Sequence, residues 1–416
     1  MTQLACRFCA HPLVHTFVDL GMSPLANSYR GPEERQSPET FYPLHTYVCS
    51  KCFLVQLPEV QSPEAIFSDY AYFSSYSDSW LRHAEGYVES MVERFGFDGD
   101  SRVVEVASND GYLLQYFHRR GVPVLGIEPA ANVAEAAREK GIETLVEFFG
   151  TDLARRLRSE GLGETGRGAD LILGNNVLAH TPYLNDFVAG LAILLAEDGV
   201  VTLEFPHLVQ LMAENQFDTI YHEHFSYFSF SAVTRVLEHH GLEVFDVDEL
   251  PTHGGSLRVY ARHPSRPGAE PVSASVADLL DRERDLGLLD LEAYRHFAEK
   301  VRATKRKLLQ FLLTAKNEGK TVVGYGAPAK GNTLLNYCGV RTDLLDYTVD
   351  RSPHKQGHTL PGVGIPIHHP DRIRETRPDY VLILPWNLRH EIMEQMADVR
   401  EWGGRFVVAI PEVTVL

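Results

Sequence analysis

Four consecutive residues in the middle of the chain carry side chains that can move protons. Tyr221, His222, Glu223 and His224 follow residues 217–220. A histidine has an ordinary pKa of about 6.5, so it can accept a proton at neutral pH, and a neighbouring carboxylate can orient its ring. The pattern indicates general acid-base chemistry. A zinc-binding histidine pair and an exposed polar turn are the alternatives, although His222 and His224 lack a third convincing metal ligand nearby.

A ligand-binding turn is expected after a buried strand at residues 103–107. The segment Glu105-Val-Ala-Ser-Asn-Asp-Gly111 joins this strand to a helix, where backbone amides and the helix N-terminus face a ligand. It lacks the full G-x-G-x-x-G pattern, and a carboxylate before the turn repels a pyrophosphate but can pair with a cation. S-adenosylmethionine carries a sulfonium and an ammonium group and no phosphate. Glu128 ends the next strand, where it either binds ribose hydroxyls or is a surface residue.

Further candidates lie at the carboxyl edge of the same predicted sheet. Asn175 follows a strand that ends at Gly174, and His180 comes five residues later, either facing a ligand or serving as a structural histidine. Phe148 and Phe149 either flank an adenine or belong to the core. The predicted cofactor-binding residues are Glu105, Ala107, Asn109, Gly111, Glu128, Phe148 and Asn175.

Three other segments are candidates for binding the substrate. His253-Gly-Gly-Ser-Leu-Arg258 combines a flexible turn with a cation, and it either contacts a phosphate or closes a hairpin. In Gly324-Tyr-Gly-Ala-Pro-Ala-Lys330, small residues such as Gly326 let amides approach a diphosphate, or they serve packing alone. The segment 68–76 alternates hydroxyls and rings and includes Tyr72, so it either faces a ligand or packs in the core.

Four cysteines near the N-terminus form the strongest single motif. Cys6-Arg-Phe-Cys9 and Cys49-Ser-Lys-Cys52 can offer four thiolates in a tetrahedron, the closed geometry of structural zinc. A redox dithiol and a chance pattern are the alternatives, whereas disulfides do not suit a reducing cytosol. Because four thiolates leave no open position, we assign the metal to folding. Cys338 stands alone and is expected to be a small buried residue.

Strands alternate with helices in two parts of the chain, which predicts an α/β protein with parallel sheets. The first part begins near Ser101 and the second near Thr321, and residues 272–318 between them have helical spacing with Gly319 as a stop. We expect a zinc-binding domain at 1–75 and a Rossmann-like S-adenosylmethionine-binding domain at 76–262. A helical connector with a second Rossmann-like domain would follow at 263–416.

Composition excludes several classes of function. The 416 residues are 44% hydrophobic and 23% charged, without an apolar run near the roughly 20 residues that a bilayer span requires. The first residues do not resemble a secretory signal, so a cytoplasmic protein is expected. The formal net charge of -17 argues against a general nucleic-acid binder. We expect a monomer or a weak oligomer.

In this order, the motifs resemble those of the bacterial sugar C-methyltransferases of deoxysugar biosynthesis. The resemblance covers the two cysteine pairs, the E-x-x-x-N-D-G turn, the Y-x-E-H-F stretch from Tyr221 to Phe225, and the H-G-G and G-Y-G-A-x-A-K turns. It implies three domains, S-adenosylmethionine, structural zinc and a nucleotide-linked 4-keto-deoxysugar. The sugar is typically linked to thymidine diphosphate and methylated at C3, with some relatives acting at C5.

The resemblance also implies roles for individual residues. The catalytic base corresponds to His224, with Tyr221, Glu223, His180 and Tyr70 as its companions, and an ungapped match favours Tyr70 over Tyr72. Ala107 stands where relatives commonly have glycine. The predicted substrate-binding residues are Tyr72, His253, Arg258, Gly326 and Lys330. Two rival functions are a nicotinamide-dependent sugar-nucleotide oxidoreductase or epimerase, and a zinc-ribbon interaction protein.

Overall fold

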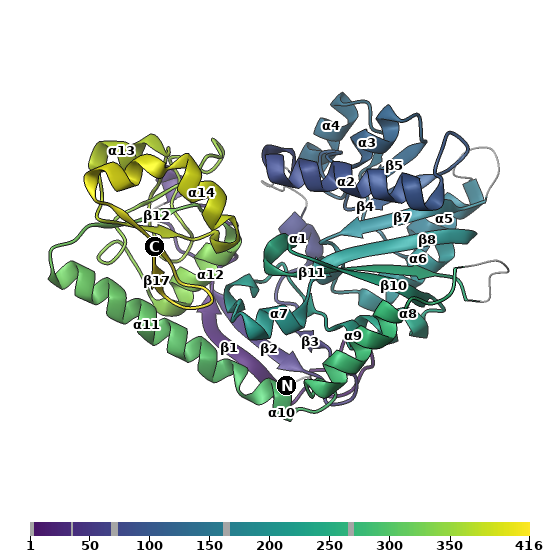
Figure 1. Cartoon of the computed structure of the whole chain (residues 1–416), viewed down its shortest axis with the longest axis horizontal. Helices are drawn as coiled ribbons and strands as arrows, with labels where there is room; N and C mark the ends of the chain where they lie inside the picture. Colours follow the sequence, from purple (N-terminus) through teal and green to yellow (C-terminus); the bar gives the residue numbers. More distant parts are fainter. Residues whose placement is uncertain (1–3, 35, 68–73, 161–166, 265–269) are drawn as a thin grey trace.

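Three β-sheets organise the protein in a computed structural model that describes residues 4–34, 36–67, 74–160, 167–264 and 270–416 (Figure 1). Two of the sheets belong to separate α/β units, and the third is a small antiparallel sheet that starts near the N-terminus. The mixed α/β class expected from the alternating pattern is confirmed. Within the described ranges, none of the helices combines the length and the apolar character that crossing a bilayer requires.

The central unit is a seven-stranded sheet in the order β10-β11-β8-β7-β4-β5-β6. The strands from β8 to β6 run parallel, whereas β11 is antiparallel to both of its neighbours. The chain leaves β4 toward β5 and β6 and then returns to β7 on the other side. Ligands bind at such a switch point in open sheets. The strands are β4 (Val103–Val106), β5 (Val124–Ile127), β6 (Thr144–Leu145), β7 (Ala169–Asn175), β8 (Leu195–Pro206), β10 (Glu243–Leu250) and β11 (Ser256–Arg262).

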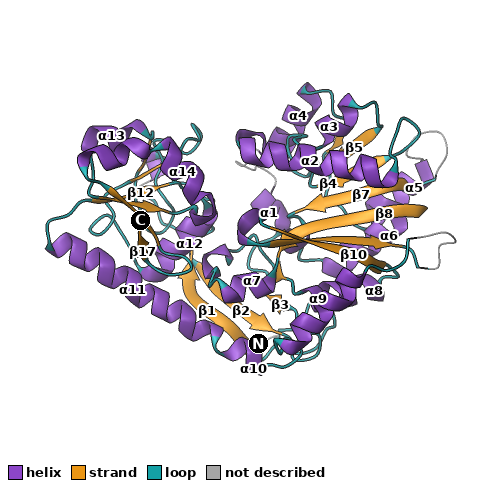
Figure 2. Ribbon diagram, in the orientation of Figure 1, coloured by secondary structure: helices purple, strands orange, loops and turns teal. Residues whose placement is uncertain are grey.

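Helices pack against this central sheet, as the ribbon diagram shows (Figure 2). The longest is α2 (Asp78–Phe95), which Ser77 caps by accepting a hydrogen bond from the Trp80 amide at 3.3 Å. Glycine at position 96 ends it with a φ of 72°. The other helices of this part are α1 (Pro63–Phe67), α3 (Leu114–Arg119), α4 (Ala131–Glu139), α5 (Thr151–Glu160), α6 (Leu184–Leu194), α7 (Leu208–Ala213) and α8 (Phe230–His239).

The C-terminal unit contains a six-stranded sheet in the order β14-β13-β12-β15-β16-β17. All its pairs are parallel except β16 with β17, and β12 lies at the switch point. The strands are β12 (Val322–Tyr325), β13 (Thr348–Val349), β14 (Ile367–His368), β15 (Tyr380–Ile383), β16 (Arg405–Val408) and β17 (Thr414–Val415). The helices from the connector onward are α9 (Ala274–Asp285), α10 (Glu292–Arg295), α11 (Phe297–Asn317), α12 (Ala329–Cys338), α13 (Asp371–Thr376) and α14 (Arg389–Gln395).

The third sheet joins the other two parts. It consists of β1 (His15–Ser23), β2 (Tyr42–Val48), β3 (Val55–Gln56) and β9 (Ser226–Tyr227), and β9 comes from the central unit. Apolar residues of β1 and β2 share a core with α11 and the C-terminal sheet, whereas the cysteine knuckles share a core with the central sheet. In Figure 1 this sheet lies at the bottom, between the two α/β units.

Two features differ from the sequence-based expectation. The segment 272–318 is three helices rather than one, because the chain turns at Gly287, whose φ of 79° is left-handed. The sheet of the central unit is not wholly parallel, because β10 and β11 form an antiparallel hairpin with Leu250 opposite Ser256. The glycine turn at residues 253–255 therefore closes a hairpin, which was one of its two expected roles.

Candidate functional site

His224 lies on a loop that connects a short 3-10 helix (Phe217–Thr219) to β9. The Nδ1 atom of His224 lies 2.8 Å from the carbonyl oxygen of Thr219. A carbonyl can only accept, so Nδ1 carries the proton and donates, and Nε2 is left with its lone pair. The loop thus fixes both the ring orientation and the tautomer of His224.

The surroundings keep this imidazole neutral. Burial lowers the pKa of His224 well below 6.5, and the charges of His180, Lys330 and His253 act in the same direction, while the hydrogen bond to Thr219 opposes them. At neutral pH the ring is therefore unprotonated. A neutral imidazole with an available lone pair is the form that accepts a proton.

Two aromatic side chains of the predicted site pack directly against His224. The ring of His180 meets it edge to face with centroids 4.7 Å apart, and the ring of Tyr221 lies at 4.0 Å. His180 reaches this position from the 3-10 helix Leu178–His180, at the carboxyl end of β7. Burial lowers the pKa of His180 to about 4, against a hydrogen bond with the backbone of Glu223. The structure thus brings three of the expected catalytic residues together.

His222 and Glu223 point into other surroundings. His222 is buried and packs against Tyr42, with Nε2 lying 3.3 Å from the carbonyl oxygen of Pro43 on β2. Glu223 is buried and accepts a hydrogen bond from Asn27 at 2.6 Å. The turn is therefore not an exposed polar turn. Within the described part of the chain, the one cluster that could hold a metal ion is formed by cysteines, so the histidine pair is not a zinc site.

Lys330 of the C-terminal unit lies beside this loop of the central unit. Its Nζ donates to Asn387 Oδ1 at 2.9 Å and lies 4.5 Å from the centre of the Trp386 ring. Burial lowers the pKa of Lys330, while the charge of Asp218 raises it. Lys330 and His224 are surrounded by protein and yet remain partly accessible to solvent.

The predicted cofactor turn has an unusual backbone. Ala107, Asn109 and Gly111 have φ values of 57°, 49° and 71°, a left-handed conformation that glycine adopts most easily. Glu128 supports the turn, since one of its carboxylate oxygens accepts from the Asn109 amide at 3.0 Å and the other from the Ala130 amide at 2.9 Å. Glu128 is thus buried and structured rather than a free surface residue.

Other members of the cofactor set have distinct environments. Glu105 is buried, and burial together with the charges of Asp110 and Glu128 raises its pKa well above the ordinary value, so a bound cation would relieve this repulsion. Neither polar atom of the Asn175 side chain has a hydrogen-bond partner among the described residues, although both atoms are buried. Phe148 is 41% exposed, whereas Phe149 packs edge to face on Phe187.

The expected substrate residues His253 and Arg258 both lie near charged side chains. His253 has a φ of 53°, and burial lowers its pKa to about 4, with Lys330 acting in the same direction. Arg258 is buried and donates to Glu204 Oε2 at 2.9 Å, and Glu204 is also contacted by His83 at 2.9 Å. Arg258 therefore already has a carboxylate partner inside the protein.

The glycine turn after β12 is closely packed. A Cβ on Gly326 would lie 2.5 Å from Pro385 Cδ. The amide of Ala327 donates to Asp350 Oδ2 at 2.7 Å, and the Gly326 amide donates to the Val349 carbonyl at 2.6 Å. These two amides have protein acceptors, so neither of them is available to a diphosphate.

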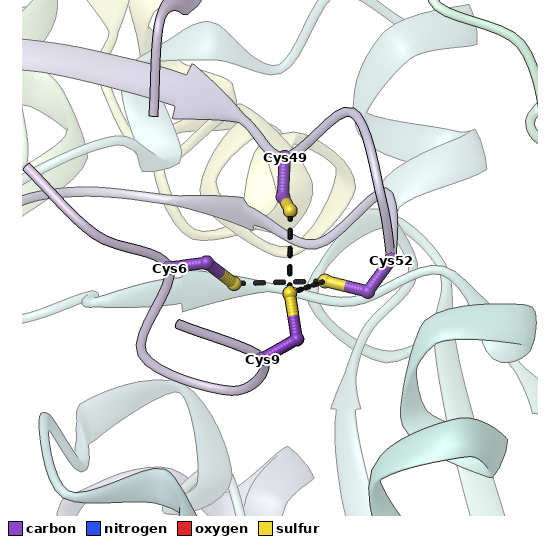
Figure 3. Close-up of side chains that lie close together, drawn as sticks. All are labelled: Cys6, Cys9, Cys49 and Cys52. Atoms are coloured by element: carbon purple, nitrogen blue, oxygen red, sulfur yellow. Dashed lines mark hydrogen bonds between the residues drawn. The ribbon is translucent and has the colours of Figure 1, made fainter. Parts of the chain in front are cut away.

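The four N-terminal sulfur atoms converge on one point (Figure 3). Three Sγ–Sγ distances are 3.5 Å for Cys6 and Cys52, 3.6 Å for Cys9 and Cys49, and 3.7 Å for Cys9 and Cys52. A tetrahedron with Zn–S bonds of about 2.3 Å has edges of about 3.8 Å, so the thiolates fit zinc. In each knuckle the residue after the second cysteine turns with a positive φ, and Gln56 Nε2 donates to Cys6 Sγ at 3.1 Å.

Comparisons with known proteins agree with this geometry. The "Putative zinc binding domain" family matches residues 6–67, the "Methyltransferase domain" family residues 80–247, and the "C-methyltransferase C-terminal domain" family residues 251–411. The C-methyltransferase NovU of Streptomyces niveus is 39% identical over 415 residues, which cover 99% of this chain and 96% of NovU. The chain belongs to the bacterial sugar C-methyltransferase family.

Solved structures resemble part of the chain more distantly. The magnesium protoporphyrin IX methyltransferase of Synechocystis PCC 6803 with bound SAM has a TM-score of 0.33 and 16% identity, covering 44% of this chain and 79% of that one. The PH0226 protein of Pyrococcus horikoshii OT3 has a TM-score of 0.38 and 13% identity, covering 48% of this chain and 97% of that one.

The cofactors of this C-methyltransferase are S-adenosylmethionine and structural zinc. The residues at the switch point of the central sheet fit S-adenosylmethionine. Clustered carboxylates at Glu105 and Asp110 suit a cationic ligand, and the unpartnered polar atoms of Asn175 lie at the carboxyl end of β7. The four thiolates of the cysteine cluster fit zinc.

Sequence reasoning missed several residues of the C-methyltransferase site. Asp218 is fully buried and accepts a hydrogen bond from Trp386 Nε1 at 2.7 Å. The carbonyl of Thr219 holds His224, and a backbone acceptor leaves no signal in a sequence. An acidic residue three positions before Tyr221, between Phe217 and Thr219, was the signal that could have found Asp218. Tyr70 and Tyr72 lie outside the described residues.

Proposed function

We propose that this C-methyltransferase acts on a nucleotide-linked 4-keto-deoxysugar, with thymidine diphosphate as the nucleotide and C3 as the methylated carbon. His224 is the general base. The observation that carries the proposal is the 2.8 Å hydrogen bond from His224 Nδ1 to Thr219, because it leaves a neutral Nε2 with an available lone pair.

The chemistry requires a proton to leave the carbon next to the ketone. His224 Nε2 accepts this proton, and the electron pair of the C–H bond moves into an enolate whose charge rests on the former ketone oxygen. S-adenosylmethionine, when bound, supplies the electrophilic methyl group that the carbon accepts. The hydrogen bond from Nδ1 to Thr219 stabilises the imidazolium that forms.

Neighbouring side chains have supporting roles in this proposal. Tyr221 and His180 lie against His224 and are placed to donate hydrogen bonds to the developing oxyanion, where preorganised donors contribute most. Glu223 holds Asn27 and so anchors the loop to the N-terminal segment. Lys330 and His253, whose charges act on His224, are the residues that we expect to face the sugar nucleotide.

The test is incubation of the purified protein with S-adenosylmethionine and a dTDP-linked 4-keto-deoxysugar. Mass spectrometry should show the sugar nucleotide gaining one methylene, and NMR of the product should place the methyl group at C3. A methyl group at C5 would correct the position but keep the activity. An unchanged sugar nucleotide, with a protein that still binds S-adenosylhomocysteine, would refute the proposed substrate class.

A further inference from the structure

Trp386 of the C-terminal unit reaches into the central unit, where it contacts Asp218 ahead of His224 and Gly254 in the turn that carries His253. It lies in the 3-10 helix Trp386–Leu388, directly after β15, and is 7% exposed. Its indole Nε1 donates to Asp218 Oδ2 at 2.7 Å. One face of its ring lies 4.5 Å from Lys330 Nζ.

The edge of the same indole lies against the turn that carries His253. A Cβ built on Gly254 would lie 2.6 Å from the Cη2 atom of Trp386, so only glycine fits there. The Gly254 carbonyl accepts from Gln216 Nε2 at 2.7 Å, and Gln216 directly precedes the 3-10 helix of the base loop. The indole, the glycine turn and the start of the base loop thus form one packed unit.

A second hydrogen bond from the C-terminal unit holds the same loop. Thr333 on α12 donates from Oγ1 to the carbonyl of Ile220 at 3.1 Å. Asp218 and Ile220 flank Thr219, whose carbonyl holds His224. The two contacts therefore fix the backbone on either side of the acceptor that orients the base.

We propose that Asp218 is a positioning residue through which Trp386 of the C-terminal unit fixes the Thr219 carbonyl and so the orientation of His224. This inference rests on the proposed function, since it takes His224 as the base. It gives the C-terminal unit a part in proton abstraction. The pair Trp386 and Asp218 acts through the loop and touches no reacting atom.

The other interactions of Asp218 agree with this role. Its Oδ1 has no hydrogen-bond partner and its side chain is buried, so Trp386 supplies its one side-chain donor in the described part of the chain. Burial raises the pKa of Asp218 to about 6, with the Lys330 charge and the indole hydrogen bond opposing this change. Losing the indole donor therefore removes the side-chain hydrogen bond of a buried carboxyl group, which then has backbone donors alone.

The experiment measures proton abstraction separately from methyl transfer. A dTDP-linked 4-keto-deoxysugar is incubated with enzyme and S-adenosylhomocysteine in D2O, and deuterium uptake next to the ketone is followed by NMR. Trp386→Phe keeps an aromatic ring at this position but removes the N–H together with the five-membered ring of the indole. We expect exchange and kcat to fall about 10- to 100-fold, as misplacement of a catalytic group does. KM and the affinity for S-adenosylhomocysteine should stay unchanged.

The chain offers a matched control in the same unit. Trp402 donates its Nε1 proton to the carbonyl of Pro378 at 3.1 Å, away from the base loop. Trp402→Phe deletes the same kind of hydrogen bond and should exchange deuterium at the wild-type rate. Equal losses in the two variants would mean that the effect is general loosening of the C-terminal unit, and would overturn the inference.

Variants of Asp218 keep the test decisive if Trp386→Phe folds poorly. Asp218→Asn retains an oxygen that accepts from the indole and should keep most of the exchange, whereas Asp218→Ala should lose as much as Trp386→Phe. The double variant Trp386→Phe with Asp218→Ala should be no worse than either single variant, because both remove one interaction. Additive losses would contradict the inference.

Failure of the inference and failure of the proposed function give different results. If the wild-type enzyme neither exchanges deuterium nor methylates the sugar nucleotide, the proposed function fails. If the wild-type enzyme does both and His224→Ala does neither, but Trp386→Phe and Asp218→Ala behave like wild type, only the positioning role fails.

Discussion

His224 donates its Nδ1 proton to the carbonyl oxygen of Thr219 over 2.8 Å, five residues back along the chain. The loop is anchored on both sides of this contact. On one side Trp386 and Thr333 of the C-terminal unit hold Asp218 and Ile220. On the other side β9 pairs with β3 of the N-terminal sheet. Both flanking units thus support the loop that carries the proposed base.

The first prediction concerns the base itself. His224→Ala should lower turnover by about 10²- to 10⁴-fold, the usual contribution of general-base catalysis, while the affinity for S-adenosylhomocysteine is retained. His222→Gln is the matched control, because the ring of His222 packs against Tyr42 on β2. Steady-state kinetics and calorimetry give both values. A His224→Ala enzyme with nearly normal turnover would exclude His224 as the base.

The second prediction concerns stability in acid. His180 and His253 have folded-state pKa values of about 4, because burial disfavours the imidazolium. Between pH 6.5 and 4 the unfolded chain therefore binds more protons, so the free energy of unfolding falls as the pH drops through this window. The difference corresponds to roughly 3 kcal/mol for each histidine.

Urea unfolding at several pH values tests this relation. Asp218 has the opposite effect, because its raised pKa stabilises the folded state in acid. The change in the free energy of unfolding with pH must therefore be compared between wild type and each histidine variant. His180→Gln and His253→Gln should each lose less stability than wild type between pH 6.5 and 4. The same substitution at His296, whose side chain is 82% exposed, should leave the dependence unchanged.

The third prediction concerns the cofactor. Asn175 lies at the carboxyl end of β7, and both of its polar side-chain atoms are buried without a partner in the described part of the chain. Asn175→Ala should weaken S-adenosylhomocysteine binding about tenfold, and should not lower the free energy of unfolding of the ligand-free protein, because no protein hydrogen bond is lost.

Asn185→Ala is the control, because it should lower stability without changing cofactor binding. Asn185 donates to the carbonyl of Phe8 at 2.9 Å and so ties α6 to the first cysteine knuckle. Its loss should lower stability by about 1 kcal/mol and leave the affinity for the cofactor product unchanged. A destabilised Asn175→Ala protein with unaltered affinity would show that Asn175 is structural.

The sequence predicts the elements best where they depend on local patterns. The strands β4, β5 and β7 and the four-cysteine cluster follow from short apolar runs and from the cysteine spacing. The two-residue strands β3 and β9 could not be predicted. They form because residues 55–56 and 226–227 meet in space, and nothing in either segment encodes the pairing.

The candidate site could likewise be predicted where local motifs determine it, but not where it depends on contacts between distant segments. His224, Tyr221 and His180 were expected together and lie together, because one motif and one strand end bring them to the same edge of the sheet. Asp218 and Trp386 were missed because they are 168 residues apart in the chain, and only the packing of two units makes them partners. Contacts across units leave no periodic signal in a sequence.

The fourth prediction concerns zinc. Wild-type protein should contain one zinc ion per chain, and Cys49→Ser with Cys52→Ser should contain almost none and melt at a lower temperature, since structural zinc contributes directly to folding. Activity should fall as well, because the first cysteine knuckle contacts the segment that carries His224. Its residue Arg7 donates to the Pro182 carbonyl at 3.1 Å and stacks 5.5 Å above the ring of Phe225, which directly follows His224.

Cys338 is the control for this experiment, since it is buried in the C-terminal unit and is not part of the cysteine cluster. Cys338→Ala should keep the full zinc content, measured by atomic emission. A protein that retains its zinc after the double substitution would mean that the metal binds elsewhere.

The fifth prediction concerns Ala107 in the cofactor turn. Its φ of 57° is left-handed, and a non-glycine residue pays about 1 kcal/mol or more to adopt this conformation. This explains why glycine suits the position independently of any contact with a ligand. Ala107→Gly should therefore raise the free energy of unfolding by about 1 kcal/mol.

Ala130→Gly is the matched control with the opposite sign. Ala130 is fully buried at the start of α4 and has an ordinary φ of −78°. Glycine at this position relieves no backbone strain. It adds conformational freedom to the unfolded chain and removes a packed methyl group, so Ala130→Gly should lower the free energy of unfolding. Calorimetric melting of both variants, with and without S-adenosylhomocysteine, separates backbone strain from crowding. An equal gain with and without ligand identifies strain, whereas a gain seen only with ligand means that the methyl group of Ala107 crowds the cofactor.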